Sequence, residues 1–154
     1  MSEAERMGQA PMPADGAAAV TQVTPRWLSL CADDFGQSAA INAGILSLIE
    51  HGRLQATSVL SEGPAWPDGA LRLKERLSSP DVSAEVGLHL NLTHAFAGAT
   101  AARPLSRWLV ASLLRLVSQT EVRDSFLRQV EAFARQFGRL PDYLDGHQQV
   151  HAFP

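Results

Sequence analysis

The sequence has few of the features that assign a chain to a specialised class of protein. Its 154 residues include a single cysteine, Cys31, so no disulfide can form within the chain. It contains no run of about 18 uninterrupted apolar residues, and no membrane span is therefore expected. The net charge of −3 provides no general attraction to nucleic acid or anionic lipid. With 45% hydrophobic and 19% charged residues, the expected class is a globular domain.

The N-terminal segment does not have the pattern of a secretion signal. The stretch GQAPMPADGAAAV is rich in small residues, proline and glycine, and no compact apolar stretch follows a basic start. We predict a disordered tail over residues 1–24 and a folded domain over residues 25–154. The protein is expected to be cytoplasmic, and its capacity to form homo-oligomers is left open.

Strand-like and helix-like patterns alternate along the folded domain. Apolar runs bounded by turn residues predict a buried strand over Trp27–Ala32 and further strands at residues 54–61, 82–93 and 143–144. Apolar residues at helical spacing predict a helix capped by Ser38, a helix over residues 68–78, and a helical region over residues 105–137. The last region is expected to break near residues 118–120, with Thr120 capping its second half.

The order of these elements, βαβαβαβ, predicts an α/β fold. Such alternation favours a parallel sheet with right-handed crossovers. Four strands would form the first half of a distorted TIM-like βα barrel, which typically needs about 250 residues. The chain is therefore interpreted as a fragment or a truncated gene product. The alternative is a small open sheet, an α/β binding domain that is complete in itself.

Acids and histidines follow the expected strands. Asp33 and Asp34 come directly after the first strand, His89 lies late in the third, and Asp145 and His147 follow the fourth. In parallel sheets the functional residues gather at the carboxyl ends of the strands. We therefore expect these five side chains to converge at one edge of the sheet.

This set of residues could hold a metal ion. Two imidazoles and a carboxylate suit a divalent metal such as Zn, Mn, Mg or Co. A metal-bound water is acidified and can attack a carbonyl, and a second carboxylate can take its proton. Structural roles remain open, because an Asp pair is common in turns and a lone histidine such as His89 is common in cores. The spacing of His147 and His151 in DGHQQVH favours the metal site.

Three other residues, Cys31, His51 and His94, are interpreted mainly as structural. Cys31 is expected to be a small buried hydrophobic residue rather than a nucleophile. His51 is expected at a helix C-terminus, where a cation is favourable, and His94 is expected in a loop. In an extended segment His151 would lie about 13 Å from His147, too far to share one ion. His151 is therefore expected to face the substrate or support a ligand, unless the chain turns there.

Three segments of the sequence resemble a known family. The stretches ADDFGQSAAINAGILSLIEHGRLQATSVL, VGLHLNLT and GRLPDYLDGHQQVHAFP are similar to those of the YdjC family of carbohydrate deacetylases, which includes chitooligosaccharide and hopanoid-biosynthesis deacetylases. They occur in the family's order, and the resemblance spans residues 28–154. It implies a βα-barrel-like fold and metal-dependent hydrolysis of an N-acetyl group on an amino sugar or glycolipid.

The resemblance also implies roles for individual residues. Asp33, the first acid of ADDFG, would be the catalytic base. Asp34, His89 of GLHLNLT and the first histidine of the last motif, His147, would bind the divalent metal, expected to be Mg or Zn. The family's last motif usually carries a histidine where this sequence has Gln149, which would alter a substrate contact or the support of a ligand. Family members also continue past this length, so the rival hypothesis is an inactive deacetylase-like fragment that binds a sugar or a partner.

Overall fold

The structure is a computed structural model that describes residues 27–96 and 102–153. The predicted tail over residues 1–24 lies outside the described residues. The elements are β1 (Cys31–Phe35), α1 (Ala39–Glu50), β2 (Ala56–Val59), α2 (Trp66–Leu77), β3 (Glu85–Leu90), α3 (Leu105–Leu113), α4 (Gln119–Phe137), β4 (Leu144–Gly146) and the 3-10 helix η1 (His147–Ala152). No helix among the described residues is long and apolar enough to cross a bilayer.

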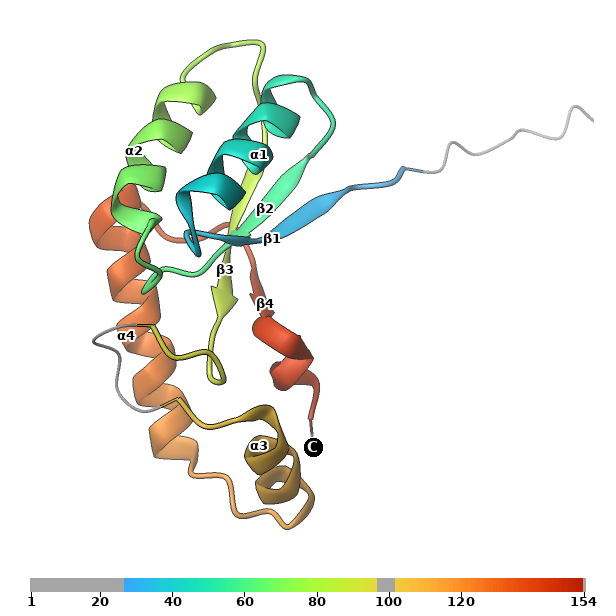
Figure 1. The fold of residues 1–154 in the computed structure, drawn as a ribbon, viewed down its shortest axis with the longest axis vertical. Coiled ribbons are helices and arrows are strands. Elements are labelled where there is room, and N and C mark those ends of the chain that lie inside the picture. The colour runs from blue at the N-terminus through green and yellow to red at the C-terminus, as the bar shows by residue number, and fades with distance from the viewer. Residues whose placement is uncertain (1–26, 97–101, 154) are drawn as a thin grey trace, which may run out of the picture.

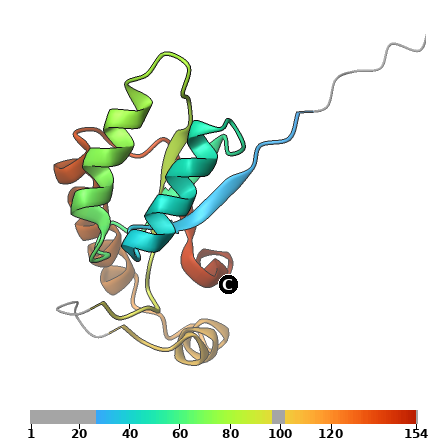
Figure 2. The same cartoon turned by 45° about the horizontal axis from the view of Figure 1, so that its top comes forward.

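The four strands form one parallel sheet in the order β1-β2-β3-β4. Each strand therefore pairs with the next strand in the sequence, and one helix, or two between β3 and β4, connects each pair, as in part of a TIM-like βα barrel. The helices α1 and α2 lie side by side against the sheet, and α4 packs beside α2 (Figures 1 and 2). The predicted α/β fold and its parallel βα order are confirmed.

The core lies between the sheet and the helices α1, α2 and α4. Its largest fully buried side chains include Phe35 of β1, Trp66 of α2 and Phe133 of α4. The rings of Trp66 and Phe133 stack with their centroids 5.3 Å apart, and Phe35 meets Trp66 edge-on at 6.2 Å. Burying side chains of this size removes large apolar areas from water, so they anchor the helices to the sheet.

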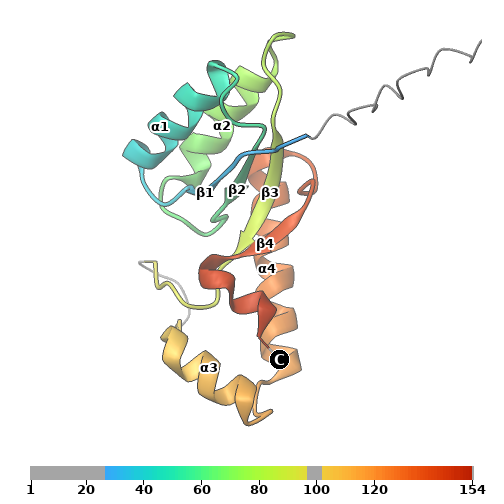
Figure 3. The same ribbon diagram turned by 90° about the vertical axis from the view of Figure 1, so that its right-hand side faces the viewer.

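The second face of the sheet carries the polar residues. In β3, Val86 and Leu88 belong to the core, so the alternation of side chains places Gly87 and His89 on the opposite face. All residues of β3 after Glu85 are buried, which shows that both faces of this strand are covered. The carboxyl end of β3 points toward α3 and η1 (Figure 3).

The first predicted strand was wrong in its position and burial. Trp27 and Leu28 are 92% and 80% exposed, and β1 begins at Cys31 and includes both acids. Cys31 itself is exposed, contrary to the prediction of a buried residue. The physical reason is that β1 lies at the edge of the described sheet and pairs only with β2. The apolar residues before β1 therefore have no strand on their other side to cover them.

Several element boundaries also differ from the prediction. Ser118 rather than Thr120 caps α4, because the Ser118 hydroxyl accepts a hydrogen bond from the backbone N–H of Glu121. The helix α2 begins at Trp66, inside a segment rich in proline and glycine, since proline is tolerated in the first turn. The last strand is Leu144–Gly146 rather than residues 143–144. Ser38 caps α1 as predicted.

Candidate metal centre

A bulge in β1 brings two adjacent acids to the same site. Between Ala32 and Phe35, β1 has one residue more than the paired segment of β2, and Asp34 has a φ of 65°. Consecutive side chains of a regular strand point to opposite faces of the sheet. The extra residue and the left-handed backbone at Asp34 form a bulge, which changes the direction of its side chain. This conformation costs about 1–2 kcal/mol for most residues, and aspartate tolerates it better than most. The surrounding structure must therefore offset the cost of this conformation at Asp34.

The loop after the bulge is held by Asn42 of α1. Its side-chain oxygen accepts a hydrogen bond from the N–H of Gly36 at 2.7 Å, and its amide group donates to the carbonyl of Ala65 at 2.9 Å. Gly36 has a φ of 98°, and a Cβ atom there would lie 2.8 Å from the carbonyl oxygen of Leu60. Only glycine fits this position, which explains the glycine of ADDFG.

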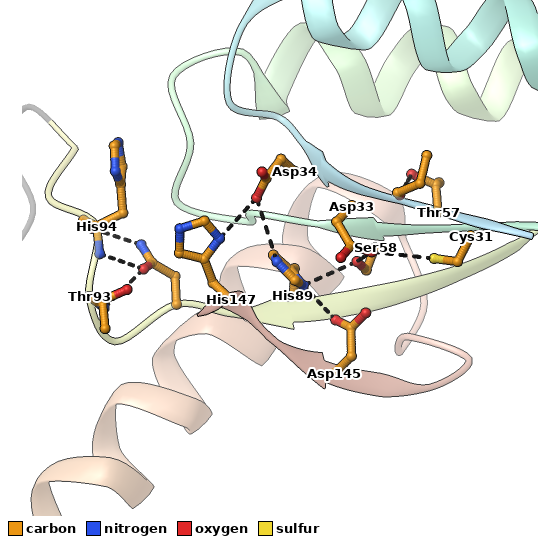
Figure 4. A network of polar contacts seen from close by, with 12 residues as sticks. Cys31, Asp33, Asp34, Thr57, Ser58, His89, Thr93, His94, Asp145 and His147 are labelled. Atoms are coloured by element: carbon orange, nitrogen blue, oxygen red, sulfur yellow. Dashed lines mark hydrogen bonds and ion pairs between the residues drawn. The ribbon is translucent and has the colours of Figure 1, made fainter. Parts of the chain in front are cut away.

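Asp34, His89 and His147 converge at the carboxyl edge of the sheet (Figure 4). Their ligand atoms lie within 4.8 Å of one another. Oδ1 of Asp34 is 3.0 Å from Nδ1 of His147 and 3.5 Å from Nε2 of His89. The side chain of His89 is 4% exposed, that of His147 is 14% exposed, and that of Asp34 is 33% exposed. Two largely buried imidazoles therefore face one carboxylate that is partly exposed to solvent.

The three side chains fit a divalent metal. Oδ1 of Asp34 is buried, and no described group forms a hydrogen bond with it, although both imidazoles are close. Atoms that each bind one tetrahedral zinc at 2.0–2.1 Å lie about 3.4 Å apart, which is close to the distances from Asp34 to the two imidazoles. A buried carboxylate oxygen without a proton donor is costly, and a cation would remove that cost. Two imidazole donors favour zinc over magnesium, which prefers oxygen ligands.

Asp33 faces a different set of groups. Its Oδ1 accepts a hydrogen bond from the Ser58 hydroxyl at 3.1 Å, and Ser58 Oγ lies 3.2 Å from Nδ1 of His89. Nδ1 of His89 is also 2.7 Å from Oδ1 of Asp145. The sequence placed Asp33 and Asp145 near the site but gave no sign of Ser58, which is a buried serine in an apolar strand. Figure 4 shows this chain of contacts running from Asp33 to Asp145.

The environment shifts the pKa values of three groups beside the site. Burial opposes protonation of His89, but the hydrogen bond and the charge of Asp145 prevail and raise its pKa. Desolvation raises the pKa of Cys31, although the Tyr143 hydroxyl, 3.0 Å from the sulfur, acts in the opposite direction. Desolvation also raises the pKa of Tyr143. A raised pKa favours the protonated thiol of Cys31 at neutral pH.

A second group of potential ligands lies next to the first. Cys31, Asp33 and Asp145 also bring one ligand atom each within 4.8 Å of one another. Asp145 contacts His89, and Asp33 contacts Ser58, so both carboxylates of this group already have hydrogen-bonding partners. Asp34 Oδ1, in the first group, has none among the described residues, which makes the first group the better metal site.

Asn91 fixes the loop that follows β3. Its side-chain oxygen accepts hydrogen bonds from the backbone N–H groups of Thr93 and His94, and its amide donates to the carbonyl of His94. The buried side chain of Gln129 in α4 pairs with both backbone polar groups of Asn91. His94 lies in this loop as predicted, and its ring centroid is 6.1 Å from that of His147.

A cavity of about 310 Å³ adjoins this loop. Its lining combines Asn91 and His94 with Trp108, Glu62, Asp124 and Arg128. Polar and charged groups predominate among these six residues, which suits a ligand rich in hydroxyl groups rather than an apolar one. Through His94 the cavity borders the candidate metal centre.

The two remaining histidines lie outside the cluster. His51 ends α1, with Nδ1 2.7 Å from the carbonyl oxygen of Ser47, in the structural role predicted for it. The backbone after β4 is not extended, because Gln148 and Gln149 both have positive φ and the chain enters η1. The side chain of His151 folds back toward Gly146. It does not belong to either group of potential ligands, although the chain turns.

Comparisons with known proteins agree with this description. The family model described as YdjC-like protein matches residues 27–154. Among solved structures, the chain is similar to a protein of Enterococcus faecalis V583 described as a "putative cellobiose-phosphate cleavage protein". The TM-score is 0.61 at 24% identity, and the match covers 80% of this chain and 49% of the other. The match therefore spans about half of the length of that protein and supports the fold.

Proposed function

This chain belongs to the YdjC-like family, and on that basis we propose that it supplies the metal centre of a hydrolase that removes an N-acetyl group from a carbohydrate containing an amino sugar. The observation that carries the proposal is the buried Oδ1 of Asp34, which faces His89 and His147 without a hydrogen bond. The N-acetyl group and the amino sugar follow from the resemblance of the three motifs to carbohydrate deacetylases.

The proposed ligands are Oδ1 of Asp34, Nε2 of His89 and Nδ1 of His147. When bound there, a divalent ion would polarise the acetyl carbonyl and acidify water for attack on it. Zinc fits the two imidazoles best, and magnesium is the second candidate. Three protein ligands leave coordination positions open, as catalytic rather than structural metal sites do.

Asp33 is the proposed general base. Its Oδ1 accepts a hydrogen bond from Ser58, so the carboxylate is held in place while its other oxygen can take a proton from water. The reaction then consumes one water, breaks the amide C–N bond, and releases acetate and an amine. The proton taken by Asp33 is available for the leaving amine, which would otherwise depart as an unstable anion.

The cavity beside His94 supplies space for part of the substrate. Its volume of about 310 Å³ and its polar lining are compatible with a sugar ring. Asn91 holds the backbone of this loop through hydrogen bonds, and the ring centroid of His94 lies 6.1 Å from that of His147. We propose that this loop contacts the carbohydrate close to the acetyl group.

A second candidate function is binding without turnover. The described residues correspond to about half of the Enterococcus faecalis protein. A chain that contains the metal ligands but lacks other catalytic groups would bind a sugar or a partner and hydrolyse nothing.

One experiment separates the two functions. The purified chain is loaded with zinc or, in a parallel sample, magnesium and incubated with N-acetylglucosamine oligosaccharides. Acetate release with stoichiometric metal supports the hydrolase. Bound metal and bound oligosaccharide without acetate release support the binding module. Absence of metal in a folded chain would contradict both, because both assign Asp34, His89 and His147 to a metal centre.

A further inference from the structure

The imidazole of His89 has polar partners at one ring nitrogen and faces Asp34 with the other. Nδ1 lies 2.7 Å from Oδ1 of Asp145 and 3.2 Å from Oγ of Ser58. Nε2, on the other side of the ring, lies 3.5 Å from Oδ1 of Asp34. Because His89 is 3% exposed, water does not compete for these positions. The ring therefore has one side for support and one side for the proposed metal.

The hydrogen bonds determine where the proton of a neutral His89 resides. An ionised carboxylate can only accept, so the bond between Asp145 and His89 requires the proton on Nδ1. Ser58 has a single hydroxyl proton and donates it to Asp33, so its oxygen can only accept from His89. Both partners therefore favour the Nδ1–H tautomer. The lone pair is then on Nε2, which faces Asp34.

The sheet register positions Asp145 for this contact. His89 of β3 and Asp145 of β4 are direct partners in the parallel ladder, flanked by the pairs Leu88–Leu144 and Leu90–Gly146. Side chains at paired positions of neighbouring strands lie on the same face of the sheet. The carboxylate is therefore held beside the imidazole by backbone pairing, with no need for a flexible loop.

We propose that Asp145 is a positioning residue that holds His89 in the Nδ1–H tautomer and so presents Nε2 as a metal ligand. The inference rests on the metal centre of the proposed function and does not depend on the deacetylation chemistry. A carboxylate that accepts the second N–H of a metal-binding histidine raises the basicity of the ligand and fixes its orientation. Removing such a group typically weakens metal binding by about 10- to 100-fold.

The tautomer can be read directly in the metal-free protein. The nitrogen chemical shifts of the ¹⁵N-labelled histidine rings are measured by NMR while the pH is raised, and the tautomer is read where the shifts of His89 no longer change with pH. His89 is assigned by the loss of its signals in His89→Ala. The expected result is a proton on Nδ1 of His89. A proton on Nε2 would overturn the proposal, and this test needs no variant of Asp145.

Zinc titration of Asp145→Asn provides the second readout. The amide of asparagine can donate to Nδ1 and favour the opposite tautomer, so we expect zinc affinity to fall about 10- to 100-fold and the proton to move to Nε2. Asp81→Asn, which replaces an exposed acid before the amino end of β3, is the matched control and should bind zinc as the wild type does. Wild-type zinc affinity in a folded Asp145→Asn would overturn the proposal.

These readouts remain separate from the proposed function. If the tautomer and the zinc affinities are as expected but no acetate is released, the positioning role of Asp145 stands and the hydrolase is contradicted. If acetate is released while Asp145→Asn binds zinc normally, the hydrolase stands and the positioning role is contradicted.

Discussion

Asp33 and Asp34 are adjacent in the sequence, but their carboxylates contact different groups. Oδ1 of Asp33 accepts a hydrogen bond from Ser58, whereas Oδ1 of Asp34 lies between the imidazoles of His89 and His147 without one. The positive φ of Asp34 and the extra residue in β1 produce this separation. Two carboxylates that would repel each other if they faced the same group are thus able to act separately.

His89 is predicted to be indispensable for metal binding. His89→Ala removes a ligand whose side chain is 4% exposed, so we expect loss of stoichiometric zinc measured by elemental analysis of the dialysed protein. His51→Ala is the control, because His51 caps α1 away from the cluster and should leave the zinc content unchanged. Full zinc content in a folded His89→Ala would show that the metal, if bound, has other ligands.

Asp33 is predicted to act on a proton and not on the metal. Asp33→Asn keeps the size of the side chain but cannot act as a base, so acetate release should fall by about 100-fold or more. The zinc content should stay at the wild-type level, since Asp33 does not belong to the first ligand group. Loss of zinc together with activity would mean that the roles of Asp33 and Asp34 are exchanged.

The sequence was sufficient to predict the architecture and the convergence of the site. Strand and helix periodicity gave the parallel βα order, and the position of His89 near the end of a strand placed it beside Asp145 and His147. Two features of the site could not be inferred. The bulge at Asp34 depends on the pairing of β1 with β2, and a serine such as Ser58 has no sequence signal when it lies in a buried strand.

The conformation after β4 shows the same limit. Residues 147–151 carry no helix signal, and an extended backbone was therefore expected. In the structure Gln148 and Gln149 adopt positive φ, and η1 returns His151 toward Gly146. In the fold η1 contacts α3, β3 and β4, and such tertiary contacts cannot be inferred from local propensity.

His151 is predicted to be dispensable for the metal. It is exposed and lies outside both groups of potential ligands, so His151→Ala should change the zinc dissociation constant by less than about threefold. Its effect on the KM for an N-acetylated oligosaccharide can be larger, because η1 lies at the carboxyl edge of the sheet. Loss of stoichiometric zinc in His151→Ala would show that His151 is a metal ligand.

Stability is predicted to depend on the protonation of Asp142 at acid pH. Arg139 donates two hydrogen bonds to this carboxylate and lowers its pKa, and the N–H of Val86 donates a third. Since the pKa is lower in the folded state, the contribution is present above the unfolded pKa and is lost as pH falls through the folded pKa. Arg139 and Asp142 are 45% and 35% exposed, so solvent limits the effect to at most about 1 kcal/mol.

Urea unfolding tests this expectation. Asp142→Asn should be less stable than the wild type at neutral pH, and the difference should shrink at about pH 3, below the pKa of about 3.9 of an unfolded aspartate. A difference of the same size at both pH values would show that the charge of Asp142 contributes nothing.

The most direct test of the metal centre is a crystal structure of the zinc-loaded chain, with anomalous scattering measured at the zinc absorption edge. We predict one strong peak bound by Oδ1 of Asp34, Nε2 of His89 and Nδ1 of His147. A peak among Cys31, Asp33 and Asp145 instead, or no peak beside Asp34, would contradict the account.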